Sequence, residues 1–341
     1  MKALTALAAI PAVIFALPAP AQRTEPVQLS AAPPCTGRDI WAGLKDSDPV
    51  SYARILDEAK AVPNAGAILW RIEGNGRPTS YLFGTIHITD DRVHALSPAI
   101  REALAGSKRL ALEVEDLSPD AVNAALAKTG HLVTYEGAQS LKTQLPPADY
   151  EAVNLALRRY GLPEEVTVRM KPWVLGLMLA LPPCEGTRVA AGLKSLDERL
   201  ADEAKSRGVP VVGLETLEEQ LRSMAGLPDD VQTTFLVATV KMFDRPEDSF
   251  ETIIRRYVGR ELAVVWPMQL VLAEKIGVPR APLDLFEKQM IVERNRRMRD
   301  AALPYLRDGG LFIGVGALHL PGREGLVEML REAGYKLTAV E

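Results

Sequence analysis

Two histidines of this chain stand in the same short pattern, Gly-x-x-His, far apart in the sequence. The first pattern is Gly84-Thr85-Ile86-His87, and the second is Gly316-Ala317-Leu318-His319. Each follows a short apolar run that predicts a buried strand, over residues 79–83 and 311–315. Because the chain has only 4 histidines, the matching placement of two of them indicates a shared chemical role.

Two carboxylates follow other predicted strands. The predicted strand over 109–115 carries Glu113, and the strand over 209–214 leads directly into Glu215. In an open α/β sheet the carboxyl ends of parallel strands meet at one edge, which is where ligands bind. The side chains expected to meet there are His87, Glu113, Glu215 and His319.

Two imidazoles and a carboxylate are a common ligand set for a divalent metal ion that activates water. The same side chains also suit metal-free general acid–base catalysis. Each has a structural alternative as well, since a lone histidine after a strand is often structural and an acid before a helix is stabilised by the helix dipole. The other histidines, His94 and His131, lie beside predicted helix ends, where surface or capping roles are expected.

The elements that must position these residues alternate between strands and helices. Strands are predicted over 67–72, 79–83, 109–115, 209–214, 311–315 and 336–340, the first two as a hairpin. Helices between the strands indicate an α/β fold: a mostly parallel sheet flanked by helices, with an antiparallel hairpin at the N-terminal side as an edge. Helical periodicity interrupted by prolines predicts a helical insertion at about 225–282, and a capping pattern at Asp284 predicts a long helix to about 303.

The composition excludes several classes of protein. With 341 residues, 47% of them hydrophobic and 25% charged, the chain is typical of a folded globular protein. A formal net charge of −4 argues against a nucleic-acid-binding protein, which usually carries a basic excess. No window in the mature chain approaches about eighteen uninterrupted apolar residues, so no transmembrane helix is expected there.

The N-terminus is typical of an exported protein. Residues 1–21 combine a basic start, an apolar run and small residues before Gln22, which predicts a signal peptide cleaved near Ala21 and a periplasmic or secreted single domain over 22–341. An uncleaved anchor is the alternative. In an oxidising compartment, Cys35 and Cys184 could form a disulfide, although two unpaired buried thiols would also fit.

Several stretches together resemble the TraB/GumN family, which includes the animal Tiki proteins. These are residues 81–87, 112–115, 171–173, 211–216 with Gln220, Arg294-Asn295 and 314–322. The resemblance covers nearly all of the mature chain. It implies a fold similar to that of erythromycin-esterase-like and ChaN-like proteins. Related sequences often have an acid where this chain has Arg260, so a ligand role for 257–260 is not expected.

The resemblance assigns roles to residues. It implies that His87, Glu113 and His319 are the catalytic or metal-binding residues of a hydrolase. It also carries over Arg294 as a catalytic and substrate-binding residue and Asn295 as a substrate-binding residue. We expect Glu215, at its strand end, to bind substrate as well. Arg294 could hold a substrate carboxylate or an oxyanion, although it lies on a basic helix face of which most residues should be solvated.

These observations lead to one functional hypothesis and two alternatives. Tiki proteins are described as metal-dependent proteases, and TraB proteins are linked to inactivation of peptide pheromones, so we expect a hydrolase of peptide or protein substrates. A divalent ion is expected as its cofactor, and the sequence does not distinguish Mn, Co and Zn. The alternatives are a ligand- or haem-binding protein that uses the same cleft without turnover, and a metal-free, esterase-like hydrolase.

Overall fold

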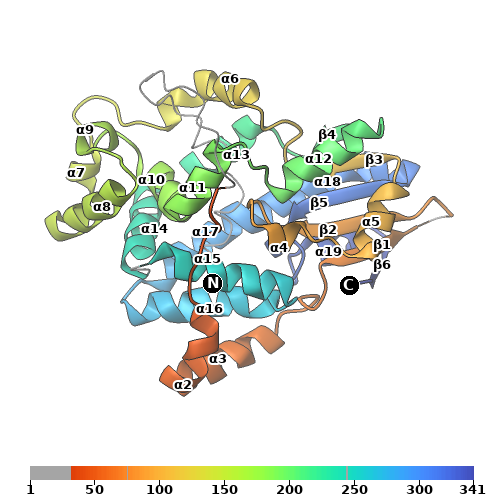
Figure 1. Cartoon of the computed structure of the whole chain (residues 1–341), viewed down its shortest axis with the longest axis horizontal. Coiled ribbons are helices and arrows are strands. Elements are labelled where there is room, and N and C mark those ends of the chain that lie inside the picture. Colours follow the sequence, from red (N-terminus) through yellow and green to blue (C-terminus); the bar gives the residue numbers. More distant parts are fainter. Residues whose placement is uncertain (1–31, 75, 243–244) are drawn as a thin grey trace.

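A computed structural model describes residues 32–74, 76–242 and 245–341; the predicted signal peptide at 1–21 lies outside them. The centre of the fold is one six-stranded sheet in the order β4-β3-β5-β2-β1-β6. Its strands are β1 (Leu69–Glu73), β2 (Ser80–Thr85), β3 (Arg109–Leu112), β4 (Val211–Gly213), β5 (Leu311–Gly316) and β6 (Lys336–Ala339). Figure 1 shows this sheet at one side of the molecule, with a large group of helices beside it.

The sheet is mixed, as predicted, but the hairpin is not at its edge. Strands β2, β5, β3 and β4 are parallel, with Leu82 opposite Ile313 and Leu112 opposite Gly213. Strand β1 runs antiparallel to β2 and also to β6, where Trp70 pairs with Ala339. The C-terminal strand β6 pairs with the free side of β1, so β6 and not the hairpin forms this edge of the sheet.

Helices cover both faces of the sheet, which gives three layers. Alternate strand residues face opposite layers, as strand geometry requires. Leu110 and Phe312 pack with residues of α5 (Pro98–Ala105) and α12 (Leu196–Ser206). On the other face, Ile313 packs against α18 (Glu293–Asp308) and α19 (Leu326–Glu332).

A third hydrophobic cluster lies among most of the remaining helices. The N-terminal pair is α2 (Ile40–Ser47) and α3 (Pro49–Lys60), and α4 (Asp91–His94) follows β2. Between β3 and β4 lie α6 (Pro119–Thr129), η2 (Gly130–Leu132), α7 (Leu141–Gln144), α8 (Pro147–Arg159), α9 (Glu164–Thr167), α10 (Pro172–Leu179) and α11 (Pro183–Ala190). Between β4 and β5 lie α13 (Leu217–Ala225), α14 (Asp229–Met242), α15 (Pro246–Val258), α16 (Leu262–Lys275), α17 (Arg280–Glu287) and the π turn η3 (Lys288–Val292), and η4 (Ala317–His319) follows β5.

Two predicted boundaries were wrong. The strand predicted over 109–115 ends at Leu112, because the chain turns there to place Glu113 in the interior, while Glu115 is exposed. The helix predicted from Asp284 begins at Arg280 instead, and Asp284 accepts a hydrogen bond from the Arg280 Nε atom at 2.8 Å rather than capping a helix start. The π turn then separates α17 from α18; such turns often occur at functional sites.

The predicted disulfide is present between Cys35 and Cys184, whose Cα atoms are 5.5 Å apart. It joins the chain ahead of α2 to the first turn of α11. No helix within the described residues is both long and apolar enough to cross a membrane.

Candidate active site

Both Gly-x-x-His patterns lie at the carboxyl end of neighbouring parallel strands. His87 follows β2, and His319 ends η4 directly after β5. Glu113 follows β3 on the other side of β5, and Glu215 lies beyond β4. The sheet order thus brings together side chains that are more than two hundred residues apart in the sequence.

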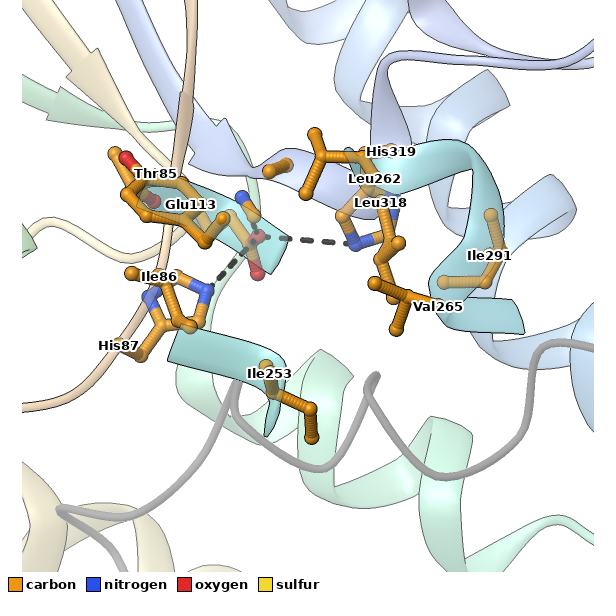
Figure 2. Close-up of a pocket in the computed structure, with 13 residues that line it drawn as sticks. Thr85, Ile86, His87, Glu113, Ile253, Leu262, Val265, Ile291, Leu318 and His319 are labelled. Atoms are coloured by element: carbon orange, nitrogen blue, oxygen red, sulfur yellow. Dashed lines mark hydrogen bonds and ion pairs between the residues drawn. The ribbon is translucent and has the colours of Figure 1, made fainter. Parts of the chain in front are cut away.

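Glu113 lies between the two imidazoles. Its Oε1 atom is 3.4 Å from the Nε2 atom of His87 and 3.7 Å from the Nε2 atom of His319. Figure 2 shows the carboxylate between the two rings, with both Nε2 atoms turned toward it. All three side chains line one pocket.

Each ring is oriented by an acceptor at its other nitrogen. The His87 Nδ1 atom lies 2.7 Å from an Asp197 carboxylate oxygen, and the His319 Nδ1 atom lies 2.6 Å from the Asn295 amide oxygen. Asn295 is itself fixed, because its Nδ2 atom donates to the Glu324 carbonyl oxygen at 2.7 Å. These contacts hold each Nδ1 atom as a donor and leave the Nε2 atoms for chemistry in the pocket.

The carboxylate of Glu113 is held from its other sides by three donors. The Gly316 amide donates to Oε1 at 2.7 Å, while Arg294 and Gln220 donate to Oε2. Arg294 is fully buried, and its Nε atom also donates to Glu215 at 2.9 Å. Burial alone would raise the pKa of Glu113, but the Arg294 guanidinium and the His87 imidazole hold that pKa well below its usual range. The side chain is therefore an ionised, fixed carboxylate.

The environment shifts the pKa values of the two imidazoles in opposite directions. Burial would lower the pKa of His87, but Asp197 and Glu113 outweigh it and raise the pKa to about 10. His319 is buried without a carboxylate at its Nδ1 atom and lies near the Arg294 and His87 charges, so its pKa falls to about 3 despite Glu113. In this arrangement the two shifts favour a protonated His87 and an unprotonated His319 near neutral pH.

Close packing explains why each pattern has a glycine at its first position. A Cβ atom on Gly84 would lie 2.9 Å from the Ala317 Cα atom, so glycine lets β2 approach the turn that carries His319. A Cβ atom on Gly316 would lie 3.1 Å from His87 Nε2 and 3.2 Å from Glu113 Oε1. Gly316 therefore keeps open the space into which the three functional groups point.

Gly316→Ala is expected to damage the site and not the fold. Its backbone, at φ −49°, suits alanine, so the effect comes from the methyl group crowding His87 and Glu113. We expect turnover to fall roughly tenfold to a hundredfold, the scale on which small displacements act, with an unchanged circular dichroism spectrum. Gly43→Ala, where an added Cβ meets nothing within 4 Å, is the control and should leave turnover unchanged. Equal turnover in both variants would contradict this view of Gly316.

The pocket wall facing these groups is apolar. It is formed by Ile86, Ile253, Leu262, Val265, Ile291 and Leu318, several of which Figure 2 shows beside the rings. Tyr257 also lines it and donates from its hydroxyl to the Gly84 carbonyl oxygen at 2.9 Å. The volume of the cavity is about 40 Å³. The polar groups thus lie against an apolar wall, where electrostatic interactions are stronger than in water.

The structure separates the predicted site residues into two groups. His87, Glu113 and His319 line the pocket, whereas Arg294, Asn295 and Glu215 lie behind them, buried and absent from its lining. Arg294 and Glu215 form an ion pair at 2.7 Å, and Arg297 reaches Glu215 at 3.1 Å. These positions suit the support of Glu113 and His319 more than contact with a substrate.

Sequence reasoning missed Asp197 and the role of Tyr257. Asp197 lies in the first turn of α12, where its sequence signal is that of an ordinary helix start. The sequence predicts no ligand role for residues 257–260, because the chain departs from related sequences at Arg260. The Tyr257 side chain nevertheless lines the pocket. Only the tertiary structure brings these residues to the site. As expected, His131 is exposed; His94 is half-buried, with its Nδ1 atom 2.7 Å from Arg199.

The donor set fits a divalent cation in its chemistry. The His87 Nε2 atom is buried without a hydrogen-bond partner, and metal ligands about 2.0–2.2 Å from an ion lie about 3.3–3.6 Å from one another, close to the spacings around Glu113 Oε1. In the arrangement of residues 32–74, 76–242 and 245–341, however, no group of three or more His, Cys, Asp or Glu side chains is placed to hold an ion. A bound ion would have to compete with Gly316 and Arg294 for Glu113.

Comparison with known proteins gives a relative and a family for this chain. The chain is 24% identical to the metalloprotease TIKI2 of Xenopus tropicalis, in an alignment that covers 82% of this chain and 60% of that protein. The chain thus spans less than two thirds of its relative's length. No solved structure matches the chain. Residues 68–339, from the first strand to the last, match the TraB/PrgY/gumN family, and the chain therefore belongs to that family.

Proposed function

We propose that this protein is an exported hydrolase that cleaves peptide bonds in peptide or protein substrates. The observation that carries the proposal is the convergence of His87, Glu113 and His319 in one apolar pocket. The kinship with a protein named a metalloprotease supports hydrolysis and a peptide substrate. The Cys35–Cys184 disulfide supports an oxidising compartment, as for a periplasmic or secreted protein.

Under this proposal, the residues of the pocket divide the work. The apolar wall holds the substrate and excludes bulk water. If a divalent ion such as Mn, Co or Zn binds, His87, Glu113 and His319 are the residues that would hold it, and the ion would acidify a water molecule and polarise a carbonyl. Asp197 and Asn295 keep the imidazoles in the tautomer that this role requires.

One observation favours a second candidate, metal-free hydrolysis. The pKa values of the two imidazoles are about 10 for His87 and about 3 for His319. Environments that separate the pKa values of neighbouring groups in this way assign one as an acid and the other as a base. His87 would then donate a proton to the leaving group, while His319 accepts one from the attacking water.

The experiment that separates these candidates combines metal analysis with a peptide-cleavage screen. The mature protein is purified without added metal, its metal content is measured, and cleavage of a peptide library is followed with and without EDTA. The proposal expects cleavage, and metal use expects that EDTA abolishes it and that one added divalent ion restores it. Cleavage that survives EDTA supports acid–base catalysis by the histidines, and no cleavage under any condition contradicts the proposed hydrolase.

A further inference from the structure

The segment that carries His87 has no secondary structure of its own. Residues 86–90 form neither helix nor strand, so neither a sheet ladder nor a helical hydrogen bond sets their path. Thr89, two residues after His87, is held by α11 instead. Its amide donates to Glu185 Oε1 at 2.6 Å and its hydroxyl to Glu185 Oε2 at 2.9 Å.

Arg188, one turn further along α11, also forms hydrogen bonds with Thr89. Its Nε atom donates to the Thr89 hydroxyl and its Nη2 atom to the Thr89 carbonyl, both at 2.8 Å. The amide, carbonyl and hydroxyl of Thr89 are thus all bonded to two side chains of one helix. Since successive Cα atoms are about 3.8 Å apart, fixing Thr89 confines the backbone of His87.

These contacts are buried, although they involve two charged side chains. Glu185 is 1% exposed and Arg188 is 5% exposed. Burying such charges is costly and contributes little net stability compared with apolar packing. Two buried side chains that bond all the polar groups of one residue are well suited to selecting one conformation of a segment, and here the segment carries a histidine of the proposed site.

The Cys35–Cys184 disulfide anchors the same helix. Cys184 is next to Glu185 in the first turn of α11, and its bond to Cys35 ties that turn to the segment that precedes α2. Arg188 also contacts the segment that precedes α2: its Nη1 atom donates to the Ala32 carbonyl oxygen at 3.2 Å. A continuous series of contacts therefore runs from the disulfide through α11 to Thr89 and His87.

We propose that Glu185 and Arg188 are positioning residues for His87, and that the Cys35–Cys184 disulfide supports them by holding the start of α11. The effect on catalysis rests on the proposed hydrolase function, whereas the effect on the placement of His87 does not. The two can therefore be tested separately.

The kinetic test uses Thr89→Val and two replacements of Glu185. Valine keeps the shape of threonine and removes the hydroxyl that joins Glu185 to Arg188, so kcat should fall about tenfold with KM changed less than about twofold. Glu185→Ala should lower kcat further. Glu185→Gln keeps an acceptor for Thr89, so its kcat should be much closer to that of the wild type than the kcat of Glu185→Ala is. Thr239→Val is the matched control, because Thr239 is a buried threonine of α14 whose hydroxyl donates to the Phe235 carbonyl oxygen of the same helix at 3.0 Å. Equal kcat values for Thr89→Val and Thr239→Val would overturn the kinetic part.

The second readout does not require turnover. With 15N-labelled histidine, the chain gives signals from 4 imidazoles, which His→Gln variants assign. Thr89→Val and reduction of the disulfide should each shift or broaden the His87 signals while leaving those of exposed His131 in place. Unchanged His87 signals in both cases would overturn the proposal. If no peptide is cleaved by the wild-type protein, the hydrolase proposal fails, and this readout still decides the positioning proposal. If Glu185→Ala does not fold, Thr89→Val alone decides it.

Discussion

Arg294→Met should lower the free energy of unfolding by about 3–5 kcal/mol, the range seen when one partner of a buried ion pair is removed. The Arg294 guanidinium has no exposed surface and lies between the carboxylates of Glu113 and Glu215. Methionine fills much of the same volume but removes the buried positive charge that Glu113 and Glu215 share, so that Glu113 keeps the His87 imidazole beside it and Glu215 keeps the partly exposed Arg297. Urea unfolding near neutral pH measures the effect.

Arg297→Met is the matched control for this prediction. Arg297 lies one turn further along α18 and also reaches Glu215, but its side chain is 41% exposed. Its loss should cost less than about 1 kcal/mol, as for other solvent-exposed ion pairs. Similar losses in the two variants would show that burial of Arg294 does not give it a special role.

The loss of unfolding free energy caused by Arg294→Met should also depend on pH. In the wild type, the pKa of Glu113 is held below its usual range, so its contribution to stability is present above about pH 4.5 and is lost as the pH falls through the folded-state pKa. Without Arg294, the pKa of Glu113 should rise from its wild-type value, because burial is then opposed mainly by the His87 imidazole, and the folded variant binds a proton at a higher pH than the folded wild type does. The difference in the free energy of unfolding between variant and wild type should therefore narrow as the pH falls from neutral through the folded-state pKa of Glu113 in the variant. A constant gap would contradict this charge assignment.

His319→Gln and His87→Gln should each lower kcat/KM for peptide cleavage by about two to four orders of magnitude, the contribution of a positioned acid, base or metal ligand. Glutamine places a polar atom near the former Nε2 position but neither transfers protons nor binds a metal ion well. Steady-state kinetics with one peptide identified in the cleavage screen measures the loss.

The chain supplies its own control for the histidine variants. His131 lies in η2, is exposed and does not line the pocket, so His131→Gln should leave kcat/KM within about twofold of the wild type. Circular dichroism shows whether each variant is folded. Full activity in a folded His319→Gln protein would remove His319 from the mechanism.

The sequence by itself determined the kinds of element and the residues at their ends. Apolar runs ending in Gly-x-x-His located two parallel strands, because a buried strand needs an apolar run and the residues that follow it emerge at the edge of the sheet. It also identified Cys35 and Cys184 as a pair, and the disulfide is present. Local signals were weaker where tertiary contacts decide, as at Asp284, whose capping pattern lies inside a helix.

Only the tertiary structure decided which residues act together. The strand order places β5 between β2 and β3, and this brings Glu113 between His87 and His319. The supporting residues Asp197 and Tyr257 come from helices whose sequences show only ordinary helical signals, since a hydrogen bond between distant segments leaves no local pattern. The hold of α11 on Thr89 is of the same kind, because it exists only once the disulfide and the packing of the helices have placed Glu185 and Arg188 beside the segment of His87.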